Sequence, residues 1–345
     1  MARRLPQFDI AKGIAILAVI VGHSEYLGVP SPLVKLAFTF HMPLFFIVSG
    51  YFARVDAPLD RAFLRRTART LLVPYALTCL AMIAIKVLRA LAAGDGSVGA
   101  ELARWVVASL YGAGSAGARL PDGVMPVGAI WFLPALFLGK VLLVLVCRVR
   151  LAPLLALLCF GLGVCTARVL WLPLSVQAAL CAVLFLYVGH LIRRFDLLGE
   201  GRMPAAVWPL LALGWVATFA LCTFYMVESR YDEGILDVVG STCATLCVLG
   251  LSDAAARRAP RLLEPLERVG QVTLPILCMH VIELNAFPWW RVAELLPATP
   301  ATWVALVLLR LLLVAVMVLL LARLPHLLSD PFFPGWRPSV GRIRG

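Results

Sequence analysis

The segment FDIAKGIAILAVIVGHS at residues 8–24 is apolar over most of its length, yet it contains Asp9, Lys12 and His23. An ionisable side chain inside a bilayer-spanning segment costs roughly 2.5–3.5 kcal/mol on insertion scales, so such residues usually serve a function. Because a helix has 3.6 residues per turn, Lys12 and His23 fall within about 20° of one helix face, about 16 Å apart along the axis. The segment therefore predicts a membrane helix with a cation and an imidazole on the same face.

Composition places the whole chain in the same class. The 345 residues are 62% hydrophobic and only 14% charged, with a mean hydropathy of +0.93. No soluble domain needs that much apolar surface, so we expect an all-α, polytopic integral membrane protein. The apolar runs predict about ten transmembrane helices, at residues 8–28, 33–53, 70–92, 127–147, 151–170, 174–193, 205–226, 235–252, 270–287 and 301–323.

The formal charge of +12 does not indicate nucleic-acid binding, because the basic residues form no patch with interleaved aromatic residues. They concentrate in alternate loops between the predicted helices. By the positive-inside rule, both termini are predicted to be cytoplasmic, which agrees with an even number of spans. The nine cysteines lie in or beside apolar segments without the paired spacing of metal ligands, so no metal site is expected.

No linker or charge boundary divides the chain, so residues 1–345 are expected to form a single membrane domain. The longest polar interruption, at about residues 93–126, is rich in glycine and is predicted to lie on the outer side. A loop of that length is usually a lid, a binding loop or a disordered segment. Within it, residues 101–112 predict a short interfacial helix with Trp105 and Tyr111 at the headgroup level. A short cytoplasmic tail is expected at about residues 324–345.

The second predicted span contains FHMPLFFIVSGYF at residues 40–52. Pro43 lacks a backbone N–H, so the helix is expected to break there and leave the carbonyl near Thr39 without its helical partner. Within a membrane such a break tends to line a cavity, because its polar groups need protein or water. His41 stands beside the break. We therefore expect His41 and His23 in the outer half or the middle of the bilayer, with Lys12 nearer the cytoplasm.

Several motifs in order along the chain give it a family resemblance. They are FDIAKGIAILAVIVGHS (8–24), FHMPLFFIVSGYF (40–52), the basic stretch before LLVPY (71–75), WFLPALF (131–137) and VGQVTLPILCMH (269–280). Together they resemble membrane-bound acyltransferase family 3, in its fucose 4-O-acetylase-like, polysaccharide O-acetyltransferase branch.

The resemblance implies a ten-helix enzyme of the inner (cytoplasmic) membrane. Such an enzyme moves an acyl group, usually acetyl from cytoplasmic acetyl-CoA, to a hydroxyl of a surface or exported glycan or its lipid-linked precursor. Acyl-CoA is then a donor substrate, and no permanently bound cofactor is expected. The family has a basic residue that is followed, after ten intervening positions, by a histidine. Lys12 and His23 match this pattern. Lysine replaces the commoner arginine, so recognition of an anion by this residue would be that of a point charge.

The chemistry of acyl transfer suggests roles for these side chains. A sugar hydroxyl needs a base to take its proton, and a neutral imidazole suits that task near pH 7. His23 is the candidate base. His41 would orient the hydroxyl or the thioester, act as the base itself, or carry the acyl group covalently, and the sequence does not decide among these.

A CoA donor brings several phosphate charges that need cations at the cytoplasmic mouth. The residues placed for this role are Lys12, Arg65, Arg66 and Arg69. Arg310 lies inside the last span, where an unpaired guanidinium is costly, so it is expected to pair with a ligand or an acid such as Glu283.

Each assignment has a structural alternative. The alternative for Lys12 is an ion pair with Asp9, one turn away, and the alternative for His41 is to cap the helix break. The arginine run at residues 61–69 fits positive-inside topology alone. Five further residues are expected to bind the substrate or support the site: Asp9, Ser49, Trp131, His280 and Glu283. The structural alternatives are a hydrogen bond between helices for His280 and Glu283, an aromatic belt instead of sugar stacking for Trp131, and helix packing for Ser49.

Two other functions remain open on the sequence. One is a proton-coupled transporter or flippase of a glycolipid or polysaccharide, in which Lys12, His23 and Glu283 relay protons. The other is a non-catalytic membrane partner of polysaccharide biosynthesis machinery.

Overall fold

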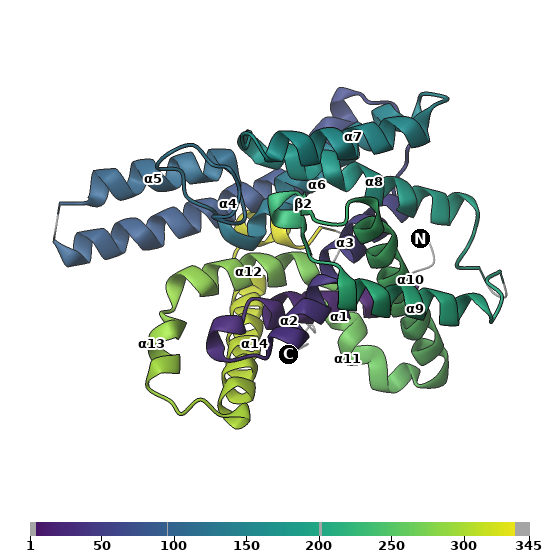
Figure 1. Cartoon of the computed structure of the whole chain (residues 1–345). Coiled ribbons are helices and arrows are strands. Elements are labelled where there is room, and N and C mark those ends of the chain that lie inside the picture. Colours follow the sequence, from purple (N-terminus) through teal and green to yellow (C-terminus); the bar gives the residue numbers. More distant parts are fainter. Residues whose placement is uncertain (1–4, 95, 200–201, 335–345) are drawn as a thin grey trace, which may run out of the picture.

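The computed structural model describes residues 5–94, 96–199 and 202–334 (Figure 1). Its architecture is nearly all-α, as predicted, and a two-stranded antiparallel sheet joins Phe224–Tyr225 (β1) to Arg230–Tyr231 (β2). The helices are α1 (Pro6–Gly22), α2 (Ser31–Phe38), α3 (His41–Tyr51), α4 (Arg61–Ala93), α5 (Val98–Tyr111), α6 (Phe132–Cys147), α7 (Ala152–Ala167), α8 (Val176–Arg194), α9 (Val207–Leu221), α10 (Ile235–Arg258), α11 (Pro260–Gln271), α12 (Thr273–Ala286), α13 (Trp289–Glu294), α14 (Pro300–Arg323) and α15 (His326–Ser329). Of the predicted tail, residues 335–345 lie outside the described part.

Six helical segments among the described residues are long and apolar enough to cross a membrane: α2 with α3, α4, the segment ending in α6, the segment ending in α8, α10 and α14. A seventh candidate is the pair α11 and α12, which is bent by 66°. Predicted spans also coincide with α1, α7 and α9, but these helices have only 17, 16 and 15 residues. The structure thus supports a multi-pass membrane protein, while the count of ten and the side of the termini stay predictions.

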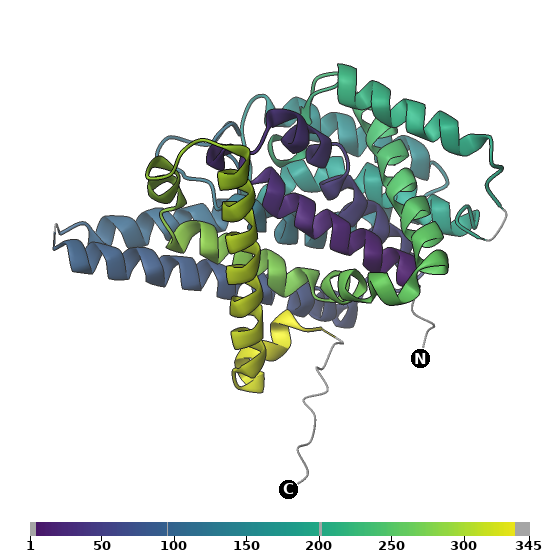
Figure 2. The same ribbon diagram turned by 90° about the horizontal axis from the view of Figure 1, so that it is seen from below.

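Helix α1 lies in the middle of the bundle, as the purple helix in Figure 2 shows. It packs against α2, α3, α10, α11, α12 and α14. A helix that is apolar on all sides fits such an interior position. The face that carries Lys12 and His23 is therefore enclosed by other helices.

Glycines allow two helices to cross closely next to α1. A Cβ added at Gly50 of α3 would collide with the backbone carbonyl of Leu186 on α8, and one at Gly189 of α8 would collide with the carbonyl of Ile47. Small residues at such a crossing let backbones approach and maximise packing contacts, which drive helix association in membranes. The crossing holds α3, and with it His41, against the rest of the bundle.

The predicted break beside His41 is confirmed. Helix α2 ends at Phe38, and α3 begins at His41 after two intervening residues. Pro43 lies in the first turn of α3, where its missing N–H removes no hydrogen bond of the helix. In the break, the Thr39 hydroxyl accepts a hydrogen bond of 2.8 Å from Nε1 of Trp215.

The predicted outer loop contains the expected helix, α5, which forms a projecting hairpin with α4 (Figure 1). Trp105 of α5 is buried, and Nζ of Lys86 on α4 lies 5.0 Å from its ring centroid. Trp105 thus packs against α4, which differs from its expected place among lipid headgroups. The burial follows from the pairing of the two helices, which residues 101–112 alone do not reveal.

Candidate active site

Two histidines from distant parts of the chain form a ring pair. His23 directly follows α1, and His280 lies on α12; their ring centroids are 5.5 Å apart and the planes meet at 64°. Nδ1 of His23 lies 2.7 Å from the carbonyl oxygen of Val19. Because a carbonyl only accepts, Nδ1 of the neutral ring carries the proton and Nε2 holds the lone pair. His23 is thereby poised to accept a proton at Nε2.

His280 is backed by a carboxylate. Its Nδ1 lies 3.2 Å from Oε2 of Glu283, one turn further along α12, and both side chains are fully buried. Proton donation from Nδ1 to that carboxylate leaves Nε2 with a lone pair. Nε2 is buried and has no hydrogen-bond partner among the described residues. A buried polar atom without a partner is rare and points to a missing ligand or a chemical role.

Arg310 of α14 binds the same carboxylate, which confirms the expected pairing with Glu283. Its Nε donates to Oε1 over 2.9 Å, and a terminal nitrogen donates to Oε2 over 3.3 Å. The other terminal nitrogen donates to the backbone carbonyl of His23 over 2.9 Å and to the Ser24 hydroxyl over 2.5 Å. The planar guanidinium can serve these partners together because its donors form a rigid fork. Arg310 therefore ties α1, α12 and α14 together around the two imidazoles.

His41 lies apart from this pair and is almost fully buried, at 3% exposed. Its Nδ1 lies 2.7 Å from the carbonyl oxygen of Ala37, so the ring caps the end of α2. The Phe38 ring contacts both His41, at 4.9 Å between centroids, and His23, at 6.4 Å. His41 thus makes the capping contact that is the structural alternative to a catalytic role. Its Nε2 forms no hydrogen bond with a described residue.

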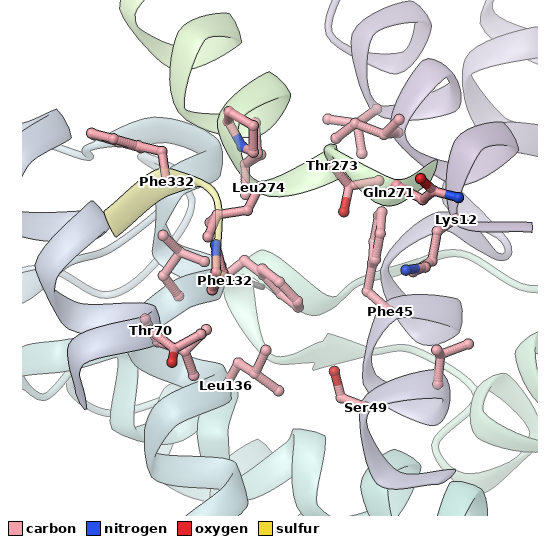
Figure 3. A pocket seen from close by; sticks show the side chains of 18 of the residues that line it. Lys12, Phe45, Ser49, Thr70, Phe132, Leu136, Gln271, Thr273, Leu274 and Phe332 are labelled. Carbon is pink, nitrogen blue, oxygen red and sulfur yellow. The ribbon is translucent and has the colours of Figure 1, made fainter. Parts of the chain in front are cut away.

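A cavity of ≈ 270 Å³, called here the Lys12 cavity, runs beside α1 and α12 (Figure 3). Its lining follows α1 from Lys12 to Val19 and α12 from Thr273 to Leu277, so it ends one turn before each of the paired histidines. Apolar side chains dominate its wall. The polar exceptions include Lys12, Ser49, Thr70, Lys140 and Gln271.

Lys12 also pairs with Asp9, its Nζ lying 2.7 Å from a carboxylate oxygen. This ion pair is the structural alternative that the sequence predicts for Lys12. Lys12 forms the pair and also lines the cavity. Asp9 itself does not line the cavity. Its ion pair with Lys12 is its contact with the cavity wall.

A second cavity, of ≈ 290 Å³ and called here the Arg66 cavity, adjoins the first, because both are lined by Thr70, Leu71 and Lys140. Arg54 and Arg66 lie in its wall. Among the described residues, no aspartate or glutamate lines either cavity, so together the two cavities form an electropositive space. The neighbouring Arg65 and Arg69 are exposed on α4 and line neither cavity.

Lys140 was missed by the sequence analysis. It is a lone cation within the predicted span 127–147, and it forms no ion pair with a described residue. An ionisable residue inside an apolar span is a signal of function, the same signal that singled out Lys12. Its position at the junction of the two cavities makes it the best-placed cation for an anionic ligand.

Other expected site residues lie elsewhere. Trp131 is in the core, 6.3 Å from the Phe46 ring between centroids, and lines none of these cavities. Arg310 contacts protein groups only and is not in a cavity wall. Within the described ranges, no group of three or more His, Cys, Asp or Glu side chains could hold a metal ion.

An apolar cavity with cations in its wall, ending one helical turn from two imidazole bases inside a membrane fold, suits an enzyme that transfers a group from a large anionic donor. Comparison with protein families defines the class. The family model for the acyltransferase domain of family 3 matches residues 5–322. The chain therefore belongs to membrane-bound acyltransferase family 3, and it is a membrane acyltransferase. No curated protein and no solved structure matches it.

Proposed function

We propose that the protein is an O-acyltransferase that moves an acyl group, most simply acetyl, from acyl-CoA to a hydroxyl of a glycan or its lipid-linked precursor. The observation that carries the proposal is the buried, unpartnered Nε2 of His280 beside the ring of His23. Two imidazole lone pairs next to an electropositive cavity suit proton transfer during attack on a thioester.

In the proposed reaction His23 is the general base. Its Nε2 takes the proton of the acceptor hydroxyl as the oxygen attacks the thioester carbonyl, so a C–O bond forms and the C–S bond breaks. The proton then passes to the leaving thiolate, which gives an ester and free CoA. His280, held by Glu283 and Arg310, stabilises the His23 imidazolium that forms between the two steps. General base catalysis of this kind contributes about 10²–10⁴ in rate.

The two joined cavities fit a CoA donor. The Lys12 cavity has the apolar wall that the pantetheine arm needs, and it ends near His23 and His280. Arg54, Arg66 and Lys140 border the Arg66 cavity, where the phosphates would bind through charge-assisted hydrogen bonds. By the positive-inside rule we expect Arg54 and Arg66 on the cytoplasmic side of the inner membrane, where acyl-CoA is made.

The geometry favours transfer over proton-coupled transport. A proton relay needs side chains that change partners, but Glu283 is held by Arg310 and His280, and Lys12 by Asp9. An association with polysaccharide biosynthesis machinery is compatible with acyl transfer, because that machinery would supply the glycan.

The test uses the full chain in lipid nanodiscs with radiolabelled acetyl-CoA and a lipid-linked saccharide acceptor. We expect label in the saccharide with wild type and a loss of at least about 10²-fold with His23→Ala. Phe195→Ala, at an exposed position that lines neither cavity, is the control for a change that should not affect the site. Proton-coupled movement of the saccharide without any acyl transfer would overturn the proposal and favour a transporter.

A further inference from the structure

A third cavity, of ≈ 450 Å³ and called here the Lys35 cavity, approaches the histidines from beyond the other end of α1. Its lining begins at Gly22, the residue before His23, and includes Glu25, Ser31, Lys35 and Phe38. On α1, the lining of the Lys12 cavity stops at Val19, one helical turn before His23. Two separate cavities thus approach the same imidazole, and no residue of the described ranges lines both.

The wall of the Lys35 cavity combines aromatic rings with polar side chains. Phe38, Phe219, Phe224 and Tyr225 are the aromatic members. Lys35 holds its Nζ 5.6 Å from the centroid of the Phe219 ring. Flat rings beside hydrogen-bonding groups match a sugar, which presents C–H faces together with hydroxyls.

The polar members are arranged before any ligand binds. The Ser31 hydroxyl donates to a carboxylate oxygen of Glu25 over 2.9 Å. That carboxylate keeps further acceptor sites, and the Lys35 ammonium makes no ion pair with a described residue. A donor and an acceptor are therefore both available in the wall for hydroxyl groups.

Phe38 separates this cavity from the imidazoles. Its ring lines the cavity, and it also lies 6.4 Å from the His23 ring and 4.9 Å from the His41 ring between centroids. A Cβ at Gly22 would come within 2.9 Å of the Phe38 ring, so the ring lies directly on the backbone next to His23. The ring also contacts Tyr225 at 5.9 Å. Neither His23 nor His41 lines the cavity while Phe38 is in this place.

We propose that the Lys35 cavity binds the saccharide acceptor and that Phe38 is the movable partition between this acceptor and the catalytic imidazole. The inference rests on the proposed acyl transfer and adds to it the site of the second substrate. Phe38 ends α2 at the break before α3, so its side chain can rotate without disturbing a helix interior. When the acceptor displaces the ring, its hydroxyl reaches Nε2 of His23.

The partition has a chemical purpose. An acyl thioester beside a base is open to attack by water, and excluding water until the acceptor arrives prevents that loss. In hydrolysis a water hydroxyl would replace the sugar hydroxyl, giving a free carboxylic acid and CoA. The partition should therefore control the ratio of transfer to hydrolysis.

The first experiment measures acetyl-CoA hydrolysis by the full chain in nanodiscs without acceptor, and then both hydrolysis and transfer with the saccharide acceptor present. Phe38→Ala opens the partition, and we expect hydrolysis to rise at least fivefold and the ratio of transfer to hydrolysis to fall at least tenfold. Phe38→Leu, which keeps an apolar plug, should lie between wild type and Phe38→Ala. Phe195→Ala, the same change at an exposed site, should match wild type.

The second experiment measures the KM for the saccharide acceptor. We expect Lys35→Ala to raise it about tenfold without changing the KM for acetyl-CoA. Lys86→Ala is the matched control, because Lys86 also lies over an aromatic ring, at 5.0 Å from Trp105, away from all three cavities.

The outcomes distinguish a failure of the proposed acyl transfer from a failure of the proposed acceptor site. If wild type transfers no acyl group at all, the proposed function fails, and this inference fails with it. If wild type transfers but Lys35→Ala leaves the acceptor KM unchanged, the acceptor site is overturned and the transfer stands. If Phe38→Ala leaves hydrolysis at the wild-type rate, Phe38 is not the partition.

Discussion

Arg310 of α14 donates a hydrogen bond of 2.9 Å to the main-chain carbonyl of His23, although the two residues are 287 positions apart. The same guanidinium binds Glu283, which in turn contacts His280. Arg310 thus fixes the backbone at His23 directly, and through Glu283 it fixes the tautomer of His280. Its substitution should affect stability and catalysis together.

Arg310→Ala should be among the most destabilising single substitutions in the chain. It leaves the fully buried Glu283 carboxylate without its cation, and breaking a buried pair typically costs about 3–5 kcal/mol. Thermal unfolding in detergent measures the loss. Arg291→Ala, which removes an arginine lying over Trp290, is the control. Equal unfolding temperatures for the two variants would contradict a structural role for the Arg310 network.

Glu283→Gln should lower kcat more than it changes either KM. The amide oxygen can still accept from Nδ1 of His280, but the negative charge that stabilises a neighbouring imidazolium is lost. We expect a decrease in kcat of at least about tenfold, within the range of general acid–base contributions. Because both residues act as one unit, His280→Gln combined with Glu283→Gln should cost little more than His280→Gln alone. Additive losses would show that Glu283 acts independently.

Lys140→Ala should weaken binding of the acyl-CoA donor. A hydrogen bond to a charged group contributes about 1.5–3 kcal/mol, so the donor KM should rise by roughly 10- to 100-fold while the acceptor KM stays unchanged. Lys12→Ala should act in the same direction. Lys140→Arg, which keeps the charge, should retain most of the affinity. Steady-state kinetics with each substrate varied in turn measures the two KM values. An unchanged donor KM in Lys140→Ala would contradict the binding of the donor phosphates in the Arg66 cavity.

Gly50→Ala should destabilise the bundle without any change of charge. The added Cβ would collide with the backbone carbonyl of Leu186, which has no flexible end to move away. Gly161→Ala is the matched control, because nothing lies within 4 Å of its added Cβ. We expect a lower unfolding temperature for Gly50→Ala only. If both variants unfold alike, the close crossing of α3 and α8 is not needed for stability.

Much of the site could be predicted from local sequence because charge inside an apolar run is informative by itself. The embedded Lys12 and His23 indicated a functional helix, and the proline after His41 indicated the break between α2 and α3. The cost of a lone guanidinium in a membrane led to the pairing of Arg310 with Glu283, which the structure contains. The membrane class and the helical fold followed from composition alone.

Only the tertiary structure decided which imidazoles meet. His23 pairs with His280, while His41 lies behind Phe38, and Lys140 turns out to join two cavities. Helical periodicity defines the face of each helix but not the helix that will cover it. In a membrane, lipid-facing and protein-facing surfaces are both apolar, so hydrophobic pattern carries little information about partners. The partners follow from close fits such as Gly50 against Leu186, and those fits exist only once the helices have packed.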